Sequence, residues 1–390
     1  MSSRFIRPKD RFLVFGSPLI GQEEVDEVVA SMKTGWLGTG PKVGRFEDDF
    51  KAYTGALYAV AVNSCTAALH LAMLVAGIGP GDEIITTPMT FCATINSIIH
   101  CGATPVLADV DPTTMNIDPA RVEETITPKT KAIVPVHFAG RPCEMDSLCD
   151  IARRHELIIV EDCAHAIETE YKGRKAGSFG HLGCFSFYVT KNVVSGEGGM
   201  IITDNGAFAT RAKALALHGM SADAWSRFSD KGYKHYLVRE AGFKYNMMDI
   251  QAAIGIHQLK RVDKNWKRRK DIWERYNEAF ADLAIGLPAD PDPETRHAHH
   301  LYTLMIGKER AGVSRDQFLQ MMNDQNIGTG VHYLSIPEHP YYQQAFGWHS
   351  KDYPNSMQIG RQTVSLPLSA KLTDDDAGDV IEAVRTVLRS

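Results

Sequence analysis

From about residue 55 to residue 205, short apolar runs alternate with segments of helical length, and this alternation constrains the fold more than any other feature. Most of the short runs are β-branched and apolar throughout, which is typical of strands covered on both faces. The predicted strands are Tyr58–Val62, Glu83–Thr87, Pro105–Asp109, Ala132–Val136, Leu157–Glu161, Cys184–Tyr188 and Gly199–Thr203. Helices are expected between many of them, for example over Ala67–Ala76 and Glu144–His155. The pattern predicts an α/β domain with a mainly parallel seven-stranded sheet.

The last third of the chain has a different pattern. Asp249–Val262 reads as an amphipathic helix with Ile250, Ala253, Ile254 and His257 on one face, and a second helical pattern extends to Leu283. A Pro-rich joint follows at 286–294. Beyond it we expect a strand at Tyr302–Ile306 and helices at Arg315–Gln325 and Asp374–Arg389. We therefore predict a large domain over 15–262 and a smaller α+β C-terminal domain over 263–390, packed with the N-terminal segment.

Composition excludes several classes of protein. The 390 residues are 44% hydrophobic and carry a formal net charge of −5, which argues against disorder and gives no footprint for nucleic acid or an anionic membrane. The seven cysteines form no C-x-x-C pair, so reduced thiols are expected. The first ten residues have no apolar core, and the most apolar stretch, 69–78, is far shorter than a membrane span. We expect a cytoplasmic protein.

The segment Asn63-Ser-Cys-Thr-Ala-Ala-Leu follows the first predicted strand. Ser64 and Thr66 suit the start of a helix, and Ala67 suits its interior. Free amide N–H groups and the helix dipole at such a start form an anion site. Taken alone, the segment is explained more simply by a plain capped helix.

Two polar residues follow the fifth predicted strand, in Leu157-Ile-Ile-Val-Glu-Asp-Cys-Ala-His. Ligands of open α/β sheets gather at the carboxyl ends of the strands, where Asp162 could hold a cationic ring nitrogen. The alternative is a helix cap by Asp162 beside a solvated His165.

Lys191 lies between an apolar strand and the Gly-rich turn Gly196-Glu-Gly-Gly. A lysine among apolar neighbours loses its proton more easily, as formation of an imine requires. The alternative is a surface lysine whose stem packs on apolar neighbours. Phe91 follows another strand end, where it could stack on a planar ring or simply belong to the core.

Together these segments are more specific than any one of them. Pyridoxal 5′-phosphate (PLP) requires an anion site for its phosphate, an acid for its pyridine nitrogen and a lysine for its aldehyde. No G-x-G-x-x-G or G-x-x-x-x-G-K-[ST] pattern competes. No metal site is expected, because H-E-x-x-H is absent and the histidines lack metal-binding spacing. His297, His299 and His300 are expected in a loop before a strand.

Nearly the whole chain resembles the DegT/DnrJ/StrS family of PLP-dependent nucleotide-sugar aminotransferases. The motifs that carry the resemblance are Thr34-Gly-Trp-Leu-Gly-Thr-Gly-Pro, Ser64-Cys-Thr-Ala-Ala-Leu, Pro80-Gly-Asp-Glu-Ile-Ile, Val136-His-Phe-Ala-Gly, Glu161-Asp-Cys-Ala-His-Ala, Phe185-Ser-Phe, Lys191-Asn, Gly196-Glu-Gly-Gly and Gly242-Phe-Lys-Tyr-Asn-Met-Met-Asp-Ile-Gln-Ala-Ala. The resemblance implies the aspartate-aminotransferase-like fold, PLP fold type I.

The resemblance also implies the roles of individual residues. Lys191 would bind the cofactor covalently and move the proton, Asp162 would pair with the ring nitrogen, and His165 would lie near the ring hydroxyl. Phe91 would stack on the ring. The phosphate would be held by Thr66, the Ala67 backbone and Ser186. In the family a loop of a second subunit, here Gly242–Met247, closes the phosphate site of a homodimer. Lys244 and Asn246 depart from the usual residues of that loop, so either is a candidate for the contact.

The implied reaction transfers an amino group from L-glutamate to a keto sugar linked to a nucleotide. The Lys244-Tyr-Asn loop and Glu161-Asp-Cys-Ala-His favour the branch that acts on UDP-4-keto sugars, in the biosynthesis of amino sugars for surface glycans such as lipopolysaccharide. Trp36, His332 and Tyr333 are substrate candidates, although ordinary packing would also explain the last two. Two alternatives stay open: a PLP-dependent sugar dehydratase, and a PLP-binding regulatory protein. The dehydratase branch carries His in place of the lysine, and no helix-turn-helix segment supports a regulator.

Overall fold

A seven-stranded sheet forms the centre of the molecule. The computed structural model describes residues 7–220 and 236–389. The sheet has the order β1-β9-β8-β5-β4-β2-β3. Its strands are β1 (Tyr58–Val62), β2 (Glu83–Thr86), β3 (Thr104–Leu107), β4 (Thr130–Val134), β5 (Ile158–Asp162), β8 (Leu182–Ser186) and β9 (Gly199–Thr203). The predicted α/β fold is therefore observed, with strand ends shifted by at most two residues.

Strand direction determines where polar loops collect. Strands β3, β2, β4, β5 and β8 are parallel, while β9 runs antiparallel to both of its neighbours, β8 and β1. The loops after the parallel strands therefore open at one edge of the sheet. Strand β1 lies at the opposite end of the strand order from β3, and β9 is its neighbour. The predicted, mainly parallel arrangement is confirmed.

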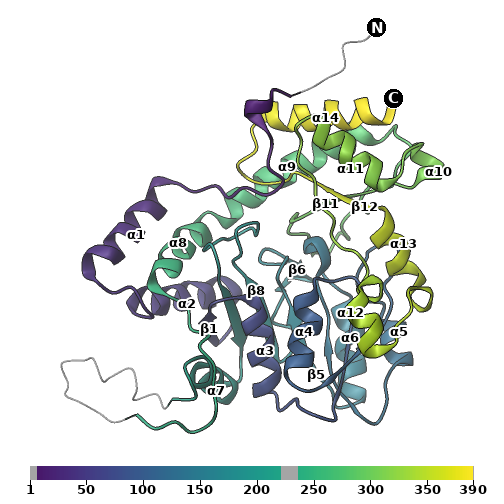
Figure 1. Cartoon of the computed structure of the whole chain (residues 1–390). Coiled ribbons are helices and arrows are strands. Elements are labelled where there is room, and N and C mark those ends of the chain that lie inside the picture. The colour runs from purple at the N-terminus through teal and green to yellow at the C-terminus, as the bar shows by residue number, and fades with distance from the viewer. Residues whose placement is uncertain (1–6, 221–235, 390) are drawn as a thin grey trace.

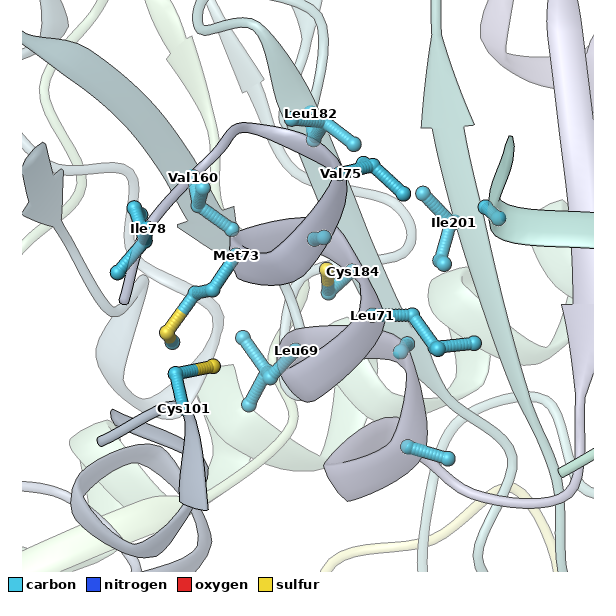
Figure 2. Packing of buried hydrophobic residues seen from close by; sticks show 14 of the residues in the cluster. Leu69, Leu71, Met73, Val75, Ile78, Cys101, Val160, Leu182, Cys184 and Ile201 are labelled. Atoms are coloured by element: carbon cyan, nitrogen blue, oxygen red, sulfur yellow. The ribbon is translucent and has the colours of Figure 1, made fainter. Parts of the chain in front are cut away.

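Helices cover the sheet, and α3 packs most deeply. Leu69, Leu71 and Met73 of α3 are buried in one cluster with apolar residues of β5, β8 and β9, as Figure 2 shows. Burying a leucine side chain contributes about 1.5–3 kcal/mol. The helices of this part of the chain are α1 (Gln22–Thr34), α2 (Pro41–Thr54), α3 (Cys65–Val75), α4 (Cys92–His100), α5 (Pro119–Glu124), α6 (Met145–Arg154), α7 (Gly206–Ala216) and α8 (Asp249–Lys260).

The apolar face expected for α8 is wrong in part. Ala252, Ile256 and Leu259 are buried, whereas Ile250 and Ile254 are only partly buried. Helices α1 and α2 pack against α8, so tertiary contacts rather than the expected periodicity select the buried side. The helix also ends at Lys260, and the charged stretch after it belongs to α9 (Val262–Phe280).

A second apolar core lies in the C-terminal part, which Figure 1 shows at one end of the molecule. Strands β11 (Tyr302–Met305) and β12 (Thr363–Leu366) pair antiparallel, and α9, α11 and α14 pack around them. Leu13 packs against this core and bridges Ile327. The domain boundary at 262/263 stays a prediction. The remaining elements are α10 (Lys308–Ala311), α11 (Arg315–Asp324), α12 (Pro340–Phe346), α13 (Pro354–Gln362), α14 (Asp374–Arg389), β6 (Glu170–Tyr171), β7 (Arg174–Lys175) and β10 (Thr295–Arg296).

All seven cysteines are free thiols, and four of them are buried. Among the described residues, the helices are too short or too polar to cross a membrane.

Candidate active site

A cavity of about 520 Å³ opens at the carboxyl ends of the parallel strands. Its wall combines the start of α3, the ends of β5 and β8, the start of α4, the loop before β9 and one loop of the C-terminal part. Eight of the twelve predicted site residues line it: Thr66, Phe91, Asp162, His165, Ser186, Lys191, His332 and Tyr333. Residues more than 260 positions apart in the chain thus meet in one place.

The start of α3 forms one end of the cavity. The Ser64 side chain caps the helix by accepting the Ala67 N–H at 3.1 Å. The first amides of an α-helix have no intrahelical acceptor, so those of Cys65 and Thr66 are available to an anion. Gly199 of β9 permits this arrangement, because a Cβ there would lie 2.5 Å from the Ser64 carbonyl group.

Asp162 ends β5 and is buried. Its carboxylate accepts the Thr94 hydroxyl at 2.8 Å and the Ala164 N–H at 3.0 Å. Burial raises the pKa of Asp162, although these donors and Lys191 oppose the shift. A buried carboxylate with so few donors gains from a cationic partner, such as a protonated ring nitrogen.

Lys191 follows a tight turn in which its N–H donates to the Tyr188 carbonyl at 2.8 Å. Burial lowers the pKa of Lys191 to about 8, with Cys65 and Asp162 opposing the shift. A larger fraction of the side chain is therefore a neutral amine near physiological pH than in an ordinary lysine. This is the property that attack on an aldehyde requires.

His165 and Tyr333 are in contact across the cavity wall. His165 Nε2 lies 2.9 Å from the Tyr333 hydroxyl, and the two rings stack 6.0 Å apart. Burial, assisted by Lys191 and His300, holds the pKa of His165 well below its usual range, so the ring is neutral. His332 hydrogen-bonds through Nδ1 to Ser365, and burial lowers its pKa to about 4. Neither histidine carries charge at neutral pH.

Phe91 is the exposed ring of the site. It precedes α4, and 58% of its surface is accessible. Its ring lies 6.0 Å from that of Tyr333. An apolar face of this kind, open to the cavity, suits stacking on a planar ring.

Four predicted residues do not line this cavity. The Ala67 N–H is already bound to Ser64, so it is not free for a phosphate. Trp36 and Asn246 line a separate cavity of about 440 Å³, where the Asn246 amide donates to the Thr39 hydroxyl at 2.6 Å. Lys244 is exposed. Within one chain, therefore, Trp36, Lys244 and Asn246 do not line the cavity of Lys191, whereas Ala67 directly follows Thr66 of its wall.

Sequence reasoning missed the residues that support the site. Thr94 holds Asp162, and the Thr90–Thr94 spacing of four at a helix start was the available signal. Asn192 donates to Glu168 at 2.7 Å and accepts from His300 at 3.0 Å, and Glu168 pairs with Arg269. No sequence pattern connects these four positions. This buried network fixes the residue next to Lys191.

One buried group has the composition of a metal site but is fully used internally. His137, Glu161 and Cys163 lie close together. The Glu161 carboxylate accepts three backbone N–H groups, from residues 177, 179 and 180, as well as contacting His137 Nε2 at 3.0 Å. His137 Nδ1 accepts the Cys143 N–H. Since these lone pairs are occupied, the group holds the loop after β7 in place.

The donor set of the main cavity fits PLP. Free amides at the start of α3, with Thr66 and Ser186, suit the phosphate. Asp162 suits the pyridine nitrogen, Phe91 the ring face and Lys191 the aldehyde. PLP itself supplies an electron sink for the carbon being aminated.

The whole chain is similar to known aminotransferases. The sequence profile described as the DegT/DnrJ/EryC1/StrS aminotransferase family matches residues 18–385. The spore coat polysaccharide biosynthesis protein SpsC of Bacillus subtilis is 50% identical over 98% of this chain and 99% of its own. The putative sugar aminotransferase Spr1654 of Streptococcus pneumoniae, in its PMP form, superposes with a TM-score of 0.91 and 33% identity over 97% of this chain and 99% of its own. Helicobacter pylori PseC, an aminotransferase involved in pseudoaminic acid biosynthesis, has a TM-score of 0.88 and 26% identity over 97% of this chain and 100% of its own.

Proposed function

Because the chain belongs to the DegT/DnrJ/EryC1/StrS aminotransferase family, we propose that it transfers an amino group from L-glutamate to a keto sugar linked to a nucleotide. The family, the PLP fold type I architecture, the aminotransferase class and the PLP requirement expected from the sequence are confirmed. The donor, the nucleotide and the sugar are our proposal.

One observation carries the proposal: Lys191 and Asp162 share a cavity with the open start of α3. The lowered pKa of Lys191 provides an amine that can give up and take back a proton. Asp162 is placed to keep a ring nitrogen protonated. Thr66 and Ser186 anchor the anionic end, so the reacting carbon stays beside Lys191.

The names of the relatives support a sugar as the amino acceptor. SpsC is named for the biosynthesis of spore coat polysaccharide, and PseC is described as an aminotransferase of pseudoaminic acid biosynthesis. We propose a UDP-linked 4-keto sugar whose product enters a surface glycan. His332 and Tyr333, at the wall formed by the C-terminal part, are the residues of this chain that we assign to the sugar. The expected cytoplasmic location stays a prediction.

We further propose a homodimer in which the loop 242–247 of one subunit closes the phosphate end of the other cavity. Val25, Val29 and Met32 of α1 are exposed apolar residues, and Ile250 and Ile254 of α8 are only partly buried, which gives this side of the chain an apolar surface. Lys244 is the favoured contact, because it is exposed while Asn246 is bound to Thr39. In this dimer, Trp36 of one subunit would line the active-site cavity of the other subunit.

The absorbance of the purified protein tests the reaction. PLP is added first, then glutamate, then a panel of nucleotide-linked 3-keto and 4-keto sugars. We expect glutamate to bleach the band of the lysine-bound cofactor and one keto sugar to restore it. A lysine-bound cofactor that ignores glutamate would favour elimination chemistry, and a protein in which PLP forms no bond to a lysine would favour the PLP-binding regulatory alternative.

Mixing two inactive variants tests the shared site. Lys191→Ala lacks the amine, and Lys244→Ala lacks the proposed phosphate contact. Mixed and reassembled, they should regain activity, because one hybrid cavity has both lysines intact. No regain, with dimers shown by light scattering, would place the whole site within one subunit.

A further inference from the structure

We propose that Tyr333 is an obligate hydrogen-bond donor to an oxygen of the ligand in the main cavity, and that His165 fixes this direction. In this role, Tyr333 would favour ligands that place an oxygen able to accept a hydrogen bond at this position. The inference rests on the proposed function, because it concerns the ligands of that site.

A backbone amide sets the direction of the hydrogen bond between His165 and Tyr333. The Ala139 N–H donates to His165 Nδ1 at 3.3 Å. A backbone N–H can only donate, so Nδ1 carries a lone pair. Because the ring is neutral, its single proton is on Nε2. The tautomer of His165 therefore follows from its surroundings.

The tautomer of His165 determines what the Tyr333 hydroxyl can donate to. The His165 Nε2–H donates to the Tyr333 hydroxyl oxygen at 2.9 Å, so this hydroxyl cannot donate back. Burial and the nearby Asp162 raise the pKa of Tyr333, so it keeps its proton. Among the described residues, His165 is the only hydrogen-bond partner of that hydroxyl. The hydroxyl proton thus has no acceptor within the wall.

The residues around Tyr333 indicate that an acceptor for its hydroxyl proton must lie in the cavity. Ring centroids of Phe91, Phe138 and His332 lie 5.0–6.2 Å from that of Tyr333. These rings pack around Tyr333, and within the described part of the chain none of them is hydrogen-bonded to its hydroxyl. Tyr333 itself lines the main cavity.

The chemistry of the partner is an oxygen with a lone pair and full or partial negative charge. Two sources offer one at this site: the ring oxygen of the cofactor, and a carbonyl or carboxylate oxygen of the substrate. A hydrogen bond to a charged acceptor is worth about 10- to 100-fold in an equilibrium or a rate. The two sources give different signatures.

Tyr333→Phe removes the hydroxyl and keeps the ring. If the acceptor is the cofactor, the pH midpoint of the bound cofactor's absorbance should rise by about one unit, because the lost donor stabilised the more negative form. If it is the substrate, the midpoint stays and the half-reaction with glutamate or the keto sugar slows about 10- to 100-fold. Tyr276→Phe, which removes a buried hydroxyl bound to the Pro367 carbonyl, is the matched control and should change neither. Unchanged midpoint and unchanged half-reactions in Tyr333→Phe would overturn the proposal.

Two variants of His165 test the direction itself. In His165→Gln, the amide can accept the Ala139 N–H with its oxygen and donate to Tyr333 with its nitrogen. In His165→Glu, the ionised carboxylate can only accept, so the Tyr333 proton would turn away from the cavity. We expect His165→Glu to reproduce the Tyr333→Phe signature, with partial rescue in His165→Gln. Equal effects of both would contradict the assigned direction. A wild-type protein that binds no PLP would instead refute the proposed function.

Discussion

Glu161 and Asp162 are adjacent carboxylates at the end of β5, yet they do opposite things. Glu161 accepts three backbone N–H groups and contacts His137, and it is completely buried. Asp162 has two donors and lines the cavity. Successive side chains of a strand point to opposite faces, so one carboxylate holds a loop and the other faces the ligand. Adjacent acids at a strand end therefore cannot be assigned the same role from their chemistry alone.

Among the substitutions that test this comparison, we expect the largest effect on the reaction rate from one at Asp162. Asp162→Asn keeps the shape and loses the charge, so the half-reaction with glutamate should slow roughly 10²- to 10³-fold, as when one partner of a buried ion pair is removed. Stopped-flow absorbance measures the rate, and urea unfolding checks that the fold is retained. A rate within threefold of wild type would separate Asp162 from the ring nitrogen.

The matched change at Glu161 should act on stability. Glu161→Gln replaces one carboxylate oxygen by an NH₂ group at a site where three backbone N–H groups need an acceptor, so at least one of them loses its partner and the free energy of unfolding should fall by about 3–5 kcal/mol. The glutamate half-reaction per folded molecule should change little. If the two amide variants gave the same pattern, the division of roles would be wrong.

Lys191 extends the comparison to pH, because it interacts with Asp162 across the cavity. Below its pKa of about 8, the rate of PLP capture by the apoprotein should rise tenfold per pH unit, and it should level off above that value. The unfolded state binds more protons between about pH 8 and the usual lysine pKa, so apoprotein stability should rise with pH there. Lys191→Met should lose this dependence. Capture that is flat from pH 6 to pH 9 would contradict the lowered pKa.

The smallest effect is expected at Thr94. Thr94→Val removes one donor from Asp162, which should raise the pKa of that carboxyl further and slow the half-reaction about fivefold, since a hydrogen bond contributes roughly 1 kcal/mol. Thr94→Ser is the control and should stay close to wild type. A loss as large as that of Asp162→Asn would mean that Thr94 touches the ligand itself.

Sequence reasoning predicted the sheet well because its strands are buried on both faces and read as continuous apolar runs. It also brought Lys191, Asp162 and Phe91 together, since each follows a strand end. It failed where tertiary contacts decide, as on α8, whose buried side is selected by α1 and α2. It also could not anticipate that the Ser64 cap uses the Ala67 N–H, or that Asn192, Glu168 and Arg269 form a network. Those contacts join distant positions by geometry alone.

The pairing of β1 with β9 has a consequence for synthesis on the ribosome. β1 lies at the end of the sheet, and β9, whose Gly199 packs on the start of α3, is the neighbour that joins it to the other strands. A nascent chain that stops before residue 199 therefore has β1 without the strand that joins it to β8, although α3 can already pack on β5 and β8. Lys191 emerges only a few residues before β9. The anion-binding end and the reactive amine are thus completed almost together, and shorter fragments should capture no cofactor.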